Sequence, residues 1–307
     1  YYPKQGTGML VDSLVGYIKA HGGDIRTGEK VDDIDPVDKT VHTAADQTYD
    51  YSQLVWAADQ KALYRLVDAG KLQDRREREG IAKQAALIAD MTGNDSVLTL
   101  YLQVNLPPSY FSEIAAGHFF YTPSRAGISA AGAADVSGTW EELRNWLGRY
   151  FALTTYEIAI PALREVSLAP EGKTGLIVST LFDYRISKAI AEKGWSIEFE
   201  TFVPRTFCDV LENSVYPGLT ASIEDHFIVT PLTLQKITGN TDGAITGWAF
   251  TNQPVPAESR LTRIANAVRT PIPDVLQAGQ WTYSPSGLPV SLITGKLAAD
   301  AIDKRLH

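Results

Sequence analysis

Cysteine, methionine and long hydrophobic runs are scarce in this chain of 307 residues, which has one cysteine and two methionines. The single cysteine, Cys208, excludes disulfide frameworks and cysteine zinc sites within one chain. No charge pattern around it would activate a thiol, so we predict a buried, unreactive side chain. No apolar run approaches the ~18 residues needed to cross a bilayer, and no signal-peptide pattern is present. The five histidines are scattered without paired ligand spacing, which predicts no metal site.

Positive charge is also in deficit. Lys and Arg number 28 against 36 Asp and Glu, and the net charge is −8. This balance provides no electrostatic footprint for nucleic acid, and we predict no nucleic-acid partner. A hydrophobic content of 44% with 21% charged residues is typical of a folded protein, and the length allows two domains. The chain does not begin with Met, which predicts a piece of a longer protein.

The first 60 residues alternate between helical and extended patterns. Apolar residues at helical spacing predict a helix from Met9, which Gly22 and Gly23 end. Extended patterns follow at 24–27, 30–35, 39–43 and 48–51, and a compact apolar run occupies 53–58. This order predicts an α/β nucleotide-binding layer with an inserted β-meander. The Gly6-Thr7-Gly8 sequence is not a dinucleotide fingerprint, because no apolar strand precedes it and Val11 stands at the third glycine position.

The middle of the chain mixes helices and strands and predicts an α+β insertion. Helical patterns occupy 61–89, 139–150, 186–193, 200–211 and 230–236, and strand patterns occupy 96–104, 154–160, 174–182 and 223–230. Charges of alternating sign at 74–79 indicate a solvated helix surface. Eight aromatic residues favour a core, with a wide apolar substrate cavity as the alternative. They are Phe119, Phe120, Tyr121, Trp140, Trp146, Tyr150, Phe151 and Tyr156.

The segment from Gly279 to Lys296 reads as a polar turn that begins a helix. Pro289 suits the first helical position, and the helix is predicted to run to about Arg305 with an apolar stripe. That stripe comprises Val290, Ile293, Leu297 and Ala301. The small residues before the helix leave its first backbone N–H groups open to an anion or a partly negative oxygen. An ordinary capped C-terminal helix is the alternative.

Five segments, in order, resemble a known family. They are Tyr2-Pro-Lys-Gln-Gly-Thr-Gly-Met9, Gly23-Asp-Ile25 with Val31-Asp-Asp-Ile34, Asp50 to Ala58, Leu168 to Lys173, and Gly279 to Gly295. Together they resemble the phytoene desaturase-like FAD-dependent oxidoreductases of the carotenoid dehydrogenase/flavin amine oxidase superfamily. Gln5 and Ser286 stand where this family usually has glycine, and Val290 stands at a small-residue place. The departure at Ser286 bears on how closely the backbone approaches the flavin.

The resemblance implies a fold of α/β plus α+β class: an incomplete Rossmann-like FAD-binding domain with a β-meander, and an inserted mixed-sheet substrate domain with helices. The implied ranges are 1–62 and 269–307 for FAD binding and 63–268 for the substrate domain. The implied cofactor-binding residues are Val31, Ala57, Ala58, Gly279, Ser286, Gly287, Leu288 and Pro289. The implied substrate residues are Tyr2, Gly6, Met9 and Trp248. The family's N-terminal Gly-rich βαβ unit is not in this sequence, so we expect this chain alone to bind FAD weakly or not at all.

For the whole protein, the resemblance implies hydride transfer from an apolar, carotenoid-like substrate to FAD. It further implies a cytoplasmic enzyme with peripheral membrane contact. Protoporphyrinogen-oxidase-like and amine-oxidase-like flavoenzymes share these segments and stay as alternatives, as does a non-catalytic binding or dimerisation module. No residue is identified as the catalytic acid or base. Four carboxylates are interpreted as surface groups: Asp32, Asp33, Glu171 and Asp183.

Overall fold

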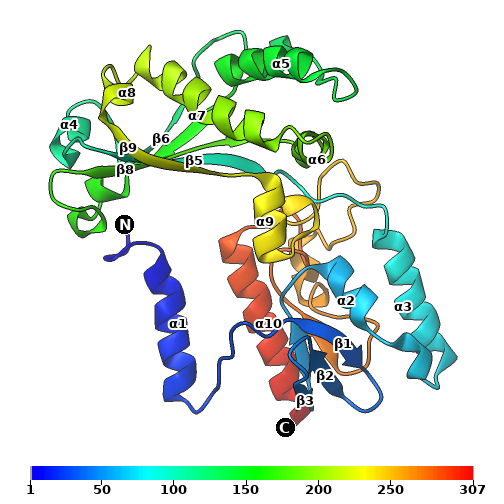
Figure 1. Cartoon of the computed structure of the whole chain (residues 1–307). Coiled ribbons are helices and arrows are strands. Elements are labelled where there is room, and N and C mark those ends of the chain that lie inside the picture. Colours follow the sequence, from blue (N-terminus) through cyan, green and yellow to red (C-terminus); the bar gives the residue numbers. More distant parts are fainter. Residues whose placement is uncertain (1, 307) are drawn as a thin grey trace. The chain divides into compact units, whose positions relative to one another are not determined.

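A computed structural model describes residues 2–306 and divides them into two compact units (Figure 1). Unit 1 contains the chain up to Ile25 together with Ser96–Thr233, and unit 2 contains Arg26–Asp95 together with the chain from Leu234. These limits differ from the predicted ranges 1–62, 63–268 and 269–307, because residues from 63–95 and 234–268 share one hydrophobic core with Ile34 of the β-meander. The predicted assignment of the ranges to FAD and substrate stays a prediction.

Unit 1 is built on a five-stranded antiparallel sheet in the order β6-β7-β8-β5-β9. The strands are β5 (Val97–Val104), β6 (His118–Tyr121), β7 (Tyr156–Ala159), β8 (Thr174–Leu181) and β9 (Ile223–Val229). Four of them confirm strand predictions. The sequence patterns did not predict β6, because its four residues are too short a run to show a period.

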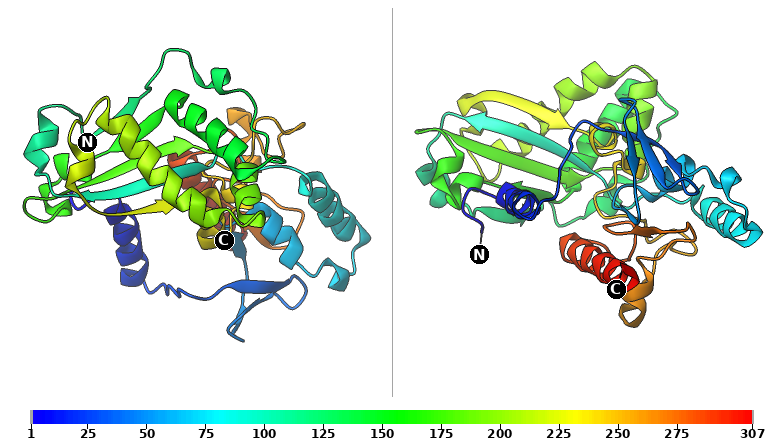
Figure 2. Two further views of the ribbon diagram at one scale, coloured as in Figure 1. Left: turned by 45° about the horizontal axis from the view of Figure 1, so that its top comes forward. Right: turned by 90° about the horizontal axis from the view of Figure 1, so that it is seen from below.

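Helices cover one face of this sheet (Figures 1 and 2). Leu98, Leu100 and Leu102 of β5 alternate with outward residues, and all three are buried against the helices. Phe151 and Phe207, on two of these helices, meet edge to face with ring centroids 5.0 Å apart. The helices of unit 1 are α1 (Gly8–Ala20), α4 (Pro108–Ser112), α5 (Trp140–Leu153), α6 (Tyr184–Glu192), α7 (Ser196–Glu212) and α8 (Leu219–Ser222), with 3-10 turns at Ile128–Ala131, Pro161–Leu163 and Val166–Leu168.

The opposite face of the sheet has no helix from this core. Strand register places Tyr101 of β5 between Ile177 of β8 and Phe227 of β9. The Tyr101 and Phe227 rings stack at 4.6 Å between centroids, and the Phe227 side chain is 58% exposed. A sheet with one packed and one open face is expected to alternate in this way. We call this second surface the open face.

Several local predictions need correction. Phe120 was predicted in the core but is 66% exposed, because it alternates with the packed Phe119 along β6. Residues 24–27 form no strand, and the single helix predicted over 61–89 is two helices separated by a 3-10 turn. The other six predicted core aromatics are buried or packed against the core. Cys208 is confirmed as buried, and desolvation raises the pKa of its thiol to about 11.

Unit 2 combines the predicted β-meander with a two-stranded parallel sheet of β4 and β10. Its strands are β1 (Val31–Asp35), β2 (Thr40–Thr43), β3 (Thr48–Asp50), β4 (Leu54–Trp56) and β10 (Val275–Gln277). Its helices are α2 (Gln60–Leu66), α3 (Arg75–Ile88) and α10 (Leu288–Leu306), with 3-10 turns at Ala69–Lys71, Thr241–Gly243 and Leu261–Asn266. Helix α9 (Pro231–Thr238) spans the change from one unit to the other. The predicted fold class is confirmed.

The buried side of α10 lies one residue beyond the predicted stripe. Thr294 and Ala298 are fully buried, whereas Ile293 is 45% exposed. A threonine is tolerated there because its hydroxyl donates to the carbonyl of Val290 at 2.9 Å and accepts from the backbone N–H of Gly279 at 3.0 Å. A polar residue thereby joins the helix to the end of β10.

Asp35 is the buried carboxylate of the meander. Lys71 donates to it at 2.6 Å, and the backbone N–H groups of Val37 and Asp38 donate at 2.8 and 2.9 Å. These bonds, the one from Lys71 foremost, lower the pKa of Asp35 from 3.8 to about 2. Because the folded pKa is the lower one, the stabilisation is present above about pH 4 and is lost as the pH falls through about 2.

We therefore expect Asp35→Asn to lower the free energy of unfolding by about 2 kcal/mol at pH 7. The difference between variant and wild type should shrink between about pH 4 and pH 2, where the wild-type carboxylate takes up its proton. Urea denaturation at several pH values measures both. A difference that stayed constant over this interval would contradict the assignment.

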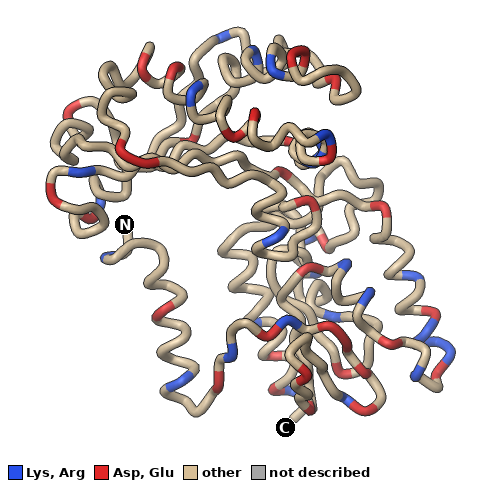
Figure 3. Tube along the Cα trace, in the orientation of Figure 1, with Lys and Arg blue, Asp and Glu red and all other residues tan. Residues whose placement is uncertain are grey.

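Acidic and basic residues are interspersed along the described chain (Figure 3). Along α3 the signs alternate, with Arg75 and Glu79 paired at 2.6 Å on an exposed surface. Such a pair contributes little to stability. Among residues 2–306, no helix is both long enough and apolar enough to pass through a bilayer.

Candidate functional site

Unit 2 brings the end of β4 and the end of β10 together. Ala278 donates its N–H to the carbonyl of Trp56 at 2.9 Å, which continues the parallel pairing by one residue. Gly279 follows with φ of 90°, and a Cβ atom there would lie 3.4 Å from the carbonyl oxygen of Ala57. Glycine is therefore favoured at this crossing, where the two backbones approach closely. The predicted residues Ala57 and Gly279 are neighbours.

The polar turn after Gly279 leads into α10. Thr282 donates its hydroxyl to the carbonyl of Gly279 at 2.8 Å. The hydroxyl of Ser286 is buried and has no hydrogen-bond partner among the described residues. The backbone N–H groups of Leu288 and Val290 also have no acceptor in that part of the chain, whereas Ser291 donates to the carbonyl of Gly287 at 2.9 Å. Three unpaired donors therefore occur at the start of a 19-residue helix.

These donors fit a partly negative acceptor such as a flavin carbonyl. A buried polar group without a partner costs free energy, and a ligand oxygen at the start of α10 would satisfy it. Ser286, which stands at a family glycine position, supplies one of the donors itself. Gly287, Leu288 and Pro289 form the turn beside it. The flavin contacts predicted for these residues, and for Ala58 and Val31, stay predictions.

Trp248 lies in the core of unit 2. It is 2% exposed, and its indole N–H faces the Gln60 side-chain oxygen at 3.2 Å and the Trp281 carbonyl at 3.1 Å. The Trp248 and Trp281 rings meet edge to face at 4.8 Å between centroids. An indole enclosed in this way packs within the core of unit 2, and its predicted substrate role stays a prediction. It supports the turn that follows β10.

The other predicted substrate residues lie in unit 1, before or at the start of α1. Gly6 is buried with φ of 85°, and its N–H donates to the carbonyl of Pro3 at 3.1 Å. Gln5, at a family glycine position, has φ of 69°, a conformation that glycine adopts more easily. The Tyr2 ring lies 5.7 Å from the guanidinium carbon of Arg164. Met9 is partly exposed at the start of α1.

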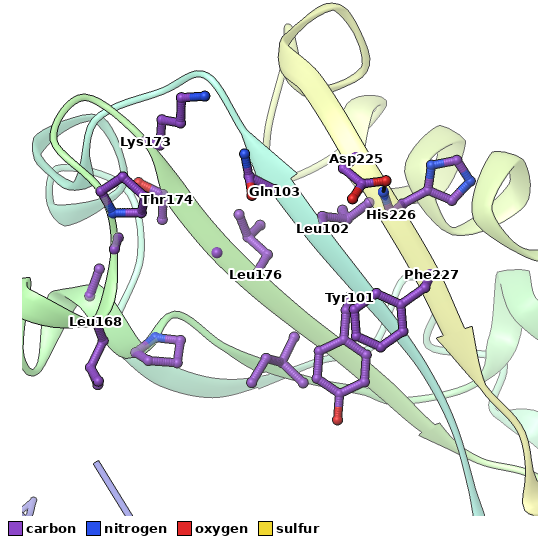
Figure 4. A pocket seen from close by; sticks show the side chains of 16 residues that line it. Tyr101, Leu102, Gln103, Leu168, Lys173, Thr174, Leu176, Asp225, His226 and Phe227 are labelled. Carbon is purple, nitrogen blue, oxygen red and sulfur yellow. Dashed lines mark hydrogen bonds between the residues drawn. The ribbon is translucent and has the colours of Figure 1, made fainter. Parts of the chain in front are cut away.

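A pocket that the sequence patterns did not predict occupies the open face (Figure 4). Its volume is about 300 Å³, and Figure 4 shows Tyr101, Leu176 and Phe227 along it. Sixteen residues line it: Tyr101, Leu102, Gln103, Pro161, Ala162, Leu168, Ala169, Pro170, Lys173, Thr174, Gly175, Leu176, Ile177, Asp225, His226 and Phe227. Only the strand register, which sequence periodicity does not determine, brings these segments together.

One end of this pocket is apolar and the other is polar. At the polar end, Lys173 and Gln103 donate to the carboxylate of Glu224 at 2.6 and 2.8 Å. These bonds, the one from Lys173 foremost, lower the pKa of Glu224. Because these three groups satisfy one another, the surface left for a ligand is the apolar wall formed by Ile177 and Phe227, with the carboxylate of Asp225 also in the lining.

The four carboxylates interpreted as surface groups have no catalytic arrangement. Asp183 accepts from the backbone N–H of Arg185 at 2.7 Å and caps α6. Asp32 and Glu171 are exposed, and Asp33 is partly exposed on β1. In residues 2–306, no cluster of three or more His, Cys, Asp or Glu side chains could hold a metal.

The known proteins that this chain resembles agree with the family suggested by the sequence motifs. No protein-family model matches the chain. The 4,4'-diapophytoene desaturase (4,4'-diaponeurosporene-forming) of Staphylococcus aureus is 29% identical over 178 residues, which are 56% of this chain and 33% of that protein. An oxidoreductase structure from Methanosarcina mazei matches 98% of this chain and 55% of its own, with a TM-score of 0.57 at 14% identity. A putrescine oxidase variant matches 98% and 53%, with a TM-score of 0.59 at 12% identity.

At such identities the solved structures show the fold alone. The chain spans about a third of the length of the curated relatives and about half of the solved ones. The desaturase match and the shared fold agree with the five motif segments. The chain is therefore similar to the phytoene desaturase-like FAD-dependent oxidoreductases.

Proposed function

We propose that this chain supplies the substrate platform and the C-terminal flavin segment of an FAD-dependent enzyme that oxidises an apolar, carotenoid-like substrate. The observation that carries the proposal is the set of unpaired donors at Ser286, Leu288 and Val290. They occur in the segment that resembles the family's flavin segment. When bound, the flavin would supply the two-electron acceptor that the chemistry requires.

The chain's own residues have two roles in this proposal. At the start of α10, the positive end of the helix dipole and the free donors would stabilise negative charge on a flavin carbonyl. On the open face, Tyr101, Ile177 and Phe227 would bind and orient an apolar substrate by excluding water from it. No acid or base is assigned to the proton that is lost.

FAD binding tests the first role. We expect this chain alone to bind FAD weakly or not at all, because the segments resembling the family contain no Gly-rich loop for the pyrophosphate. Quenching of flavin fluorescence during a titration measures it. A yellow, stoichiometric complex would contradict the expectation of weak binding. It would still support the proposal that the segment at the start of α10 binds flavin.

The second role is tested with diphenylhexatriene, a hydrocarbon polyene whose fluorescence rises in an apolar site. We expect saturable binding that Ile177→Asp weakens at least tenfold, because a carboxylate would be desolvated under the ligand. Phe120→Ala is the matched control, since Phe120 is exposed on the same sheet and does not line the pocket. Equal binding by wild type and Ile177→Asp would exclude the pocket as the substrate site.

Amine oxidation is the second candidate, favoured by the carboxylate of Asp225 at the pocket and by the fold shared with putrescine oxidase. A cationic amine would pair with this carboxylate, whereas a polyene would not. Putrescine that displaced diphenylhexatriene, and lost this effect in Asp225→Asn, would favour the amine over the polyene.

A further inference from the structure

A second pocket, of about 140 Å³, lies in unit 2 and has a largely polar lining. Residues from α2, α3, β10, the segment before β10 and the turn after it form it. They are Gln60, Tyr64, Gln84, Pro256, Ala257, Glu258, Asn266, Ala267, Arg269, Pro271, Gln277 and Thr282. None of the predicted flavin or substrate residues is among them.

Two buried amides form part of its lining. Gln60 donates its side-chain N–H to the side-chain oxygen of Gln277 at 2.8 Å, and Gln277 donates to the carbonyl of Ala267 at 2.8 Å. The Gln60 oxygen accepts from the indole of Trp248 at 3.2 Å, which fixes the orientation of both amides. Each amide nitrogen carries two hydrogens, so each keeps one N–H without an acceptor in the described chain. Residues only 3% and 8% exposed thus retain hydrogen-bonding capacity.

The remaining lining adds further unpaired donors. Tyr64 is 9% exposed, and its hydroxyl has no partner within residues 2–306. Burial raises the pKa of this phenol, so it keeps its proton at neutral pH and can donate. Arg269, in the exposed part of the lining, has no ion pair or side-chain hydrogen bond to any described residue. Its guanidinium carries five N–H donors and a permanent charge.

The one carboxylate in the lining is already paired. Glu258 accepts from the backbone N–H groups of Ser259 and Arg260 at 3.1 and 2.9 Å, and lies 3.5 Å from the Arg260 guanidinium. These contacts lower its pKa and offset its charge. The donors left over therefore include a guanidinium, a phenol and two amide N–H groups. A ligand that matches them is negatively charged and rich in acceptors.

We propose that this pocket binds a small organic carboxylate. Its charge is held by Arg269, and its oxygens accept from Tyr64 and the spare N–H groups of Gln60 and Gln277. Planar carboxylates match the guanidinium geometry, which makes Arg rather than Lys the suitable cation. The proposal does not depend on the flavin proposal, since the two involve different residues.

Succinate is the probe, titrated into the protein at constant ionic strength with sodium chloride as the reference. The signal is the indole N–H resonance of Trp248 in a proton–nitrogen NMR spectrum, because its acceptor, Gln60, lines the pocket. We expect a saturable shift with succinate and none with chloride. An unchanged spectrum, indicating that water alone fills the pocket, would overturn the proposal.

Three variants locate the site. Arg269→Gln should weaken succinate binding at least tenfold, because it removes the charge and keeps most of the size. Tyr64→Phe should weaken it about fivefold, the effect of one hydrogen bond, and loses no packing. Arg263→Gln is the matched control, since Arg263 belongs to the neighbouring 3-10 turn and does not line the pocket. Equal losses in Arg263→Gln and Arg269→Gln would indicate general charge attraction and overturn the site.

Discussion

Replacing Phe151 by alanine is expected to lower the free energy of unfolding of unit 1 by about 3–5 kcal/mol. The Phe151 side chain is fully buried beneath the sheet, and its ring contacts Phe207 at 5.0 Å and Phe182 at 6.2 Å between centroids. Truncation removes apolar burial, leaves a cavity and breaks these aromatic pairs at once. Urea denaturation followed by circular dichroism measures the loss.

Phe227→Ala is the matched control on the opposite face of the same sheet. Phe227 is 58% exposed, so the variant should lose less than about 1 kcal/mol, chiefly from its stack with Tyr101. It should instead weaken diphenylhexatriene binding, because the Phe227 ring lines the pocket. A reversed order, with Phe227→Ala the less stable variant, would contradict the assignment of packed and open faces.

The periodicity of apolar residues predicted which strands have a buried face. Which side chains meet on the opposite, open face depends on long-range strand pairing. The alternation of Leu98, Leu100 and Leu102 identified β5. It did not reveal that Tyr101 would stack on Phe227, which is more than a hundred residues away. Pairings of this kind depend on strand order and register, for which a single sequence carries no local signal.

The candidate sites could likewise be predicted from the sequence only where they depend on local structure. The glycine at Gly279 and the helix after Pro289 follow from local turn and helix chemistry, and both occur where predicted. The polar pocket depends on Gln60 and Gln277, which are 217 residues apart and which no sequence pattern singled out. Trp248 illustrates the converse, since an aromatic residue assigned to substrate is enclosed by packing that only the fold creates.

Gly247→Ala is expected to be the most damaging small substitution in unit 2. Gly247 has φ of 74°, and an added Cβ atom would lie 2.2 Å from the carbonyl oxygen of Gln280 and 3.1 Å from its carbon. Both contacts are with backbone, which cannot turn aside as a side chain can. Overpacking and the left-handed conformation together should cost about 3 kcal/mol or more.

The position of this glycine makes the effect informative about the flavin segment. Relief of the clash requires Gln280 to move, which would disturb the neighbouring Trp281 and its contact with Trp248 at 4.8 Å. We therefore expect a changed tryptophan fluorescence in the folded variant as well as a lower urea midpoint. Gly295→Ala is the control in the same unit, because a Cβ atom there would meet nothing within 4 Å and alanine favours the helix by about 1 kcal/mol. If both variants kept wild-type stability, Gly247 would not limit how closely this turn packs. The close approach of Gln280, and with it the placement of the donors at the start of α10, would then be unsupported.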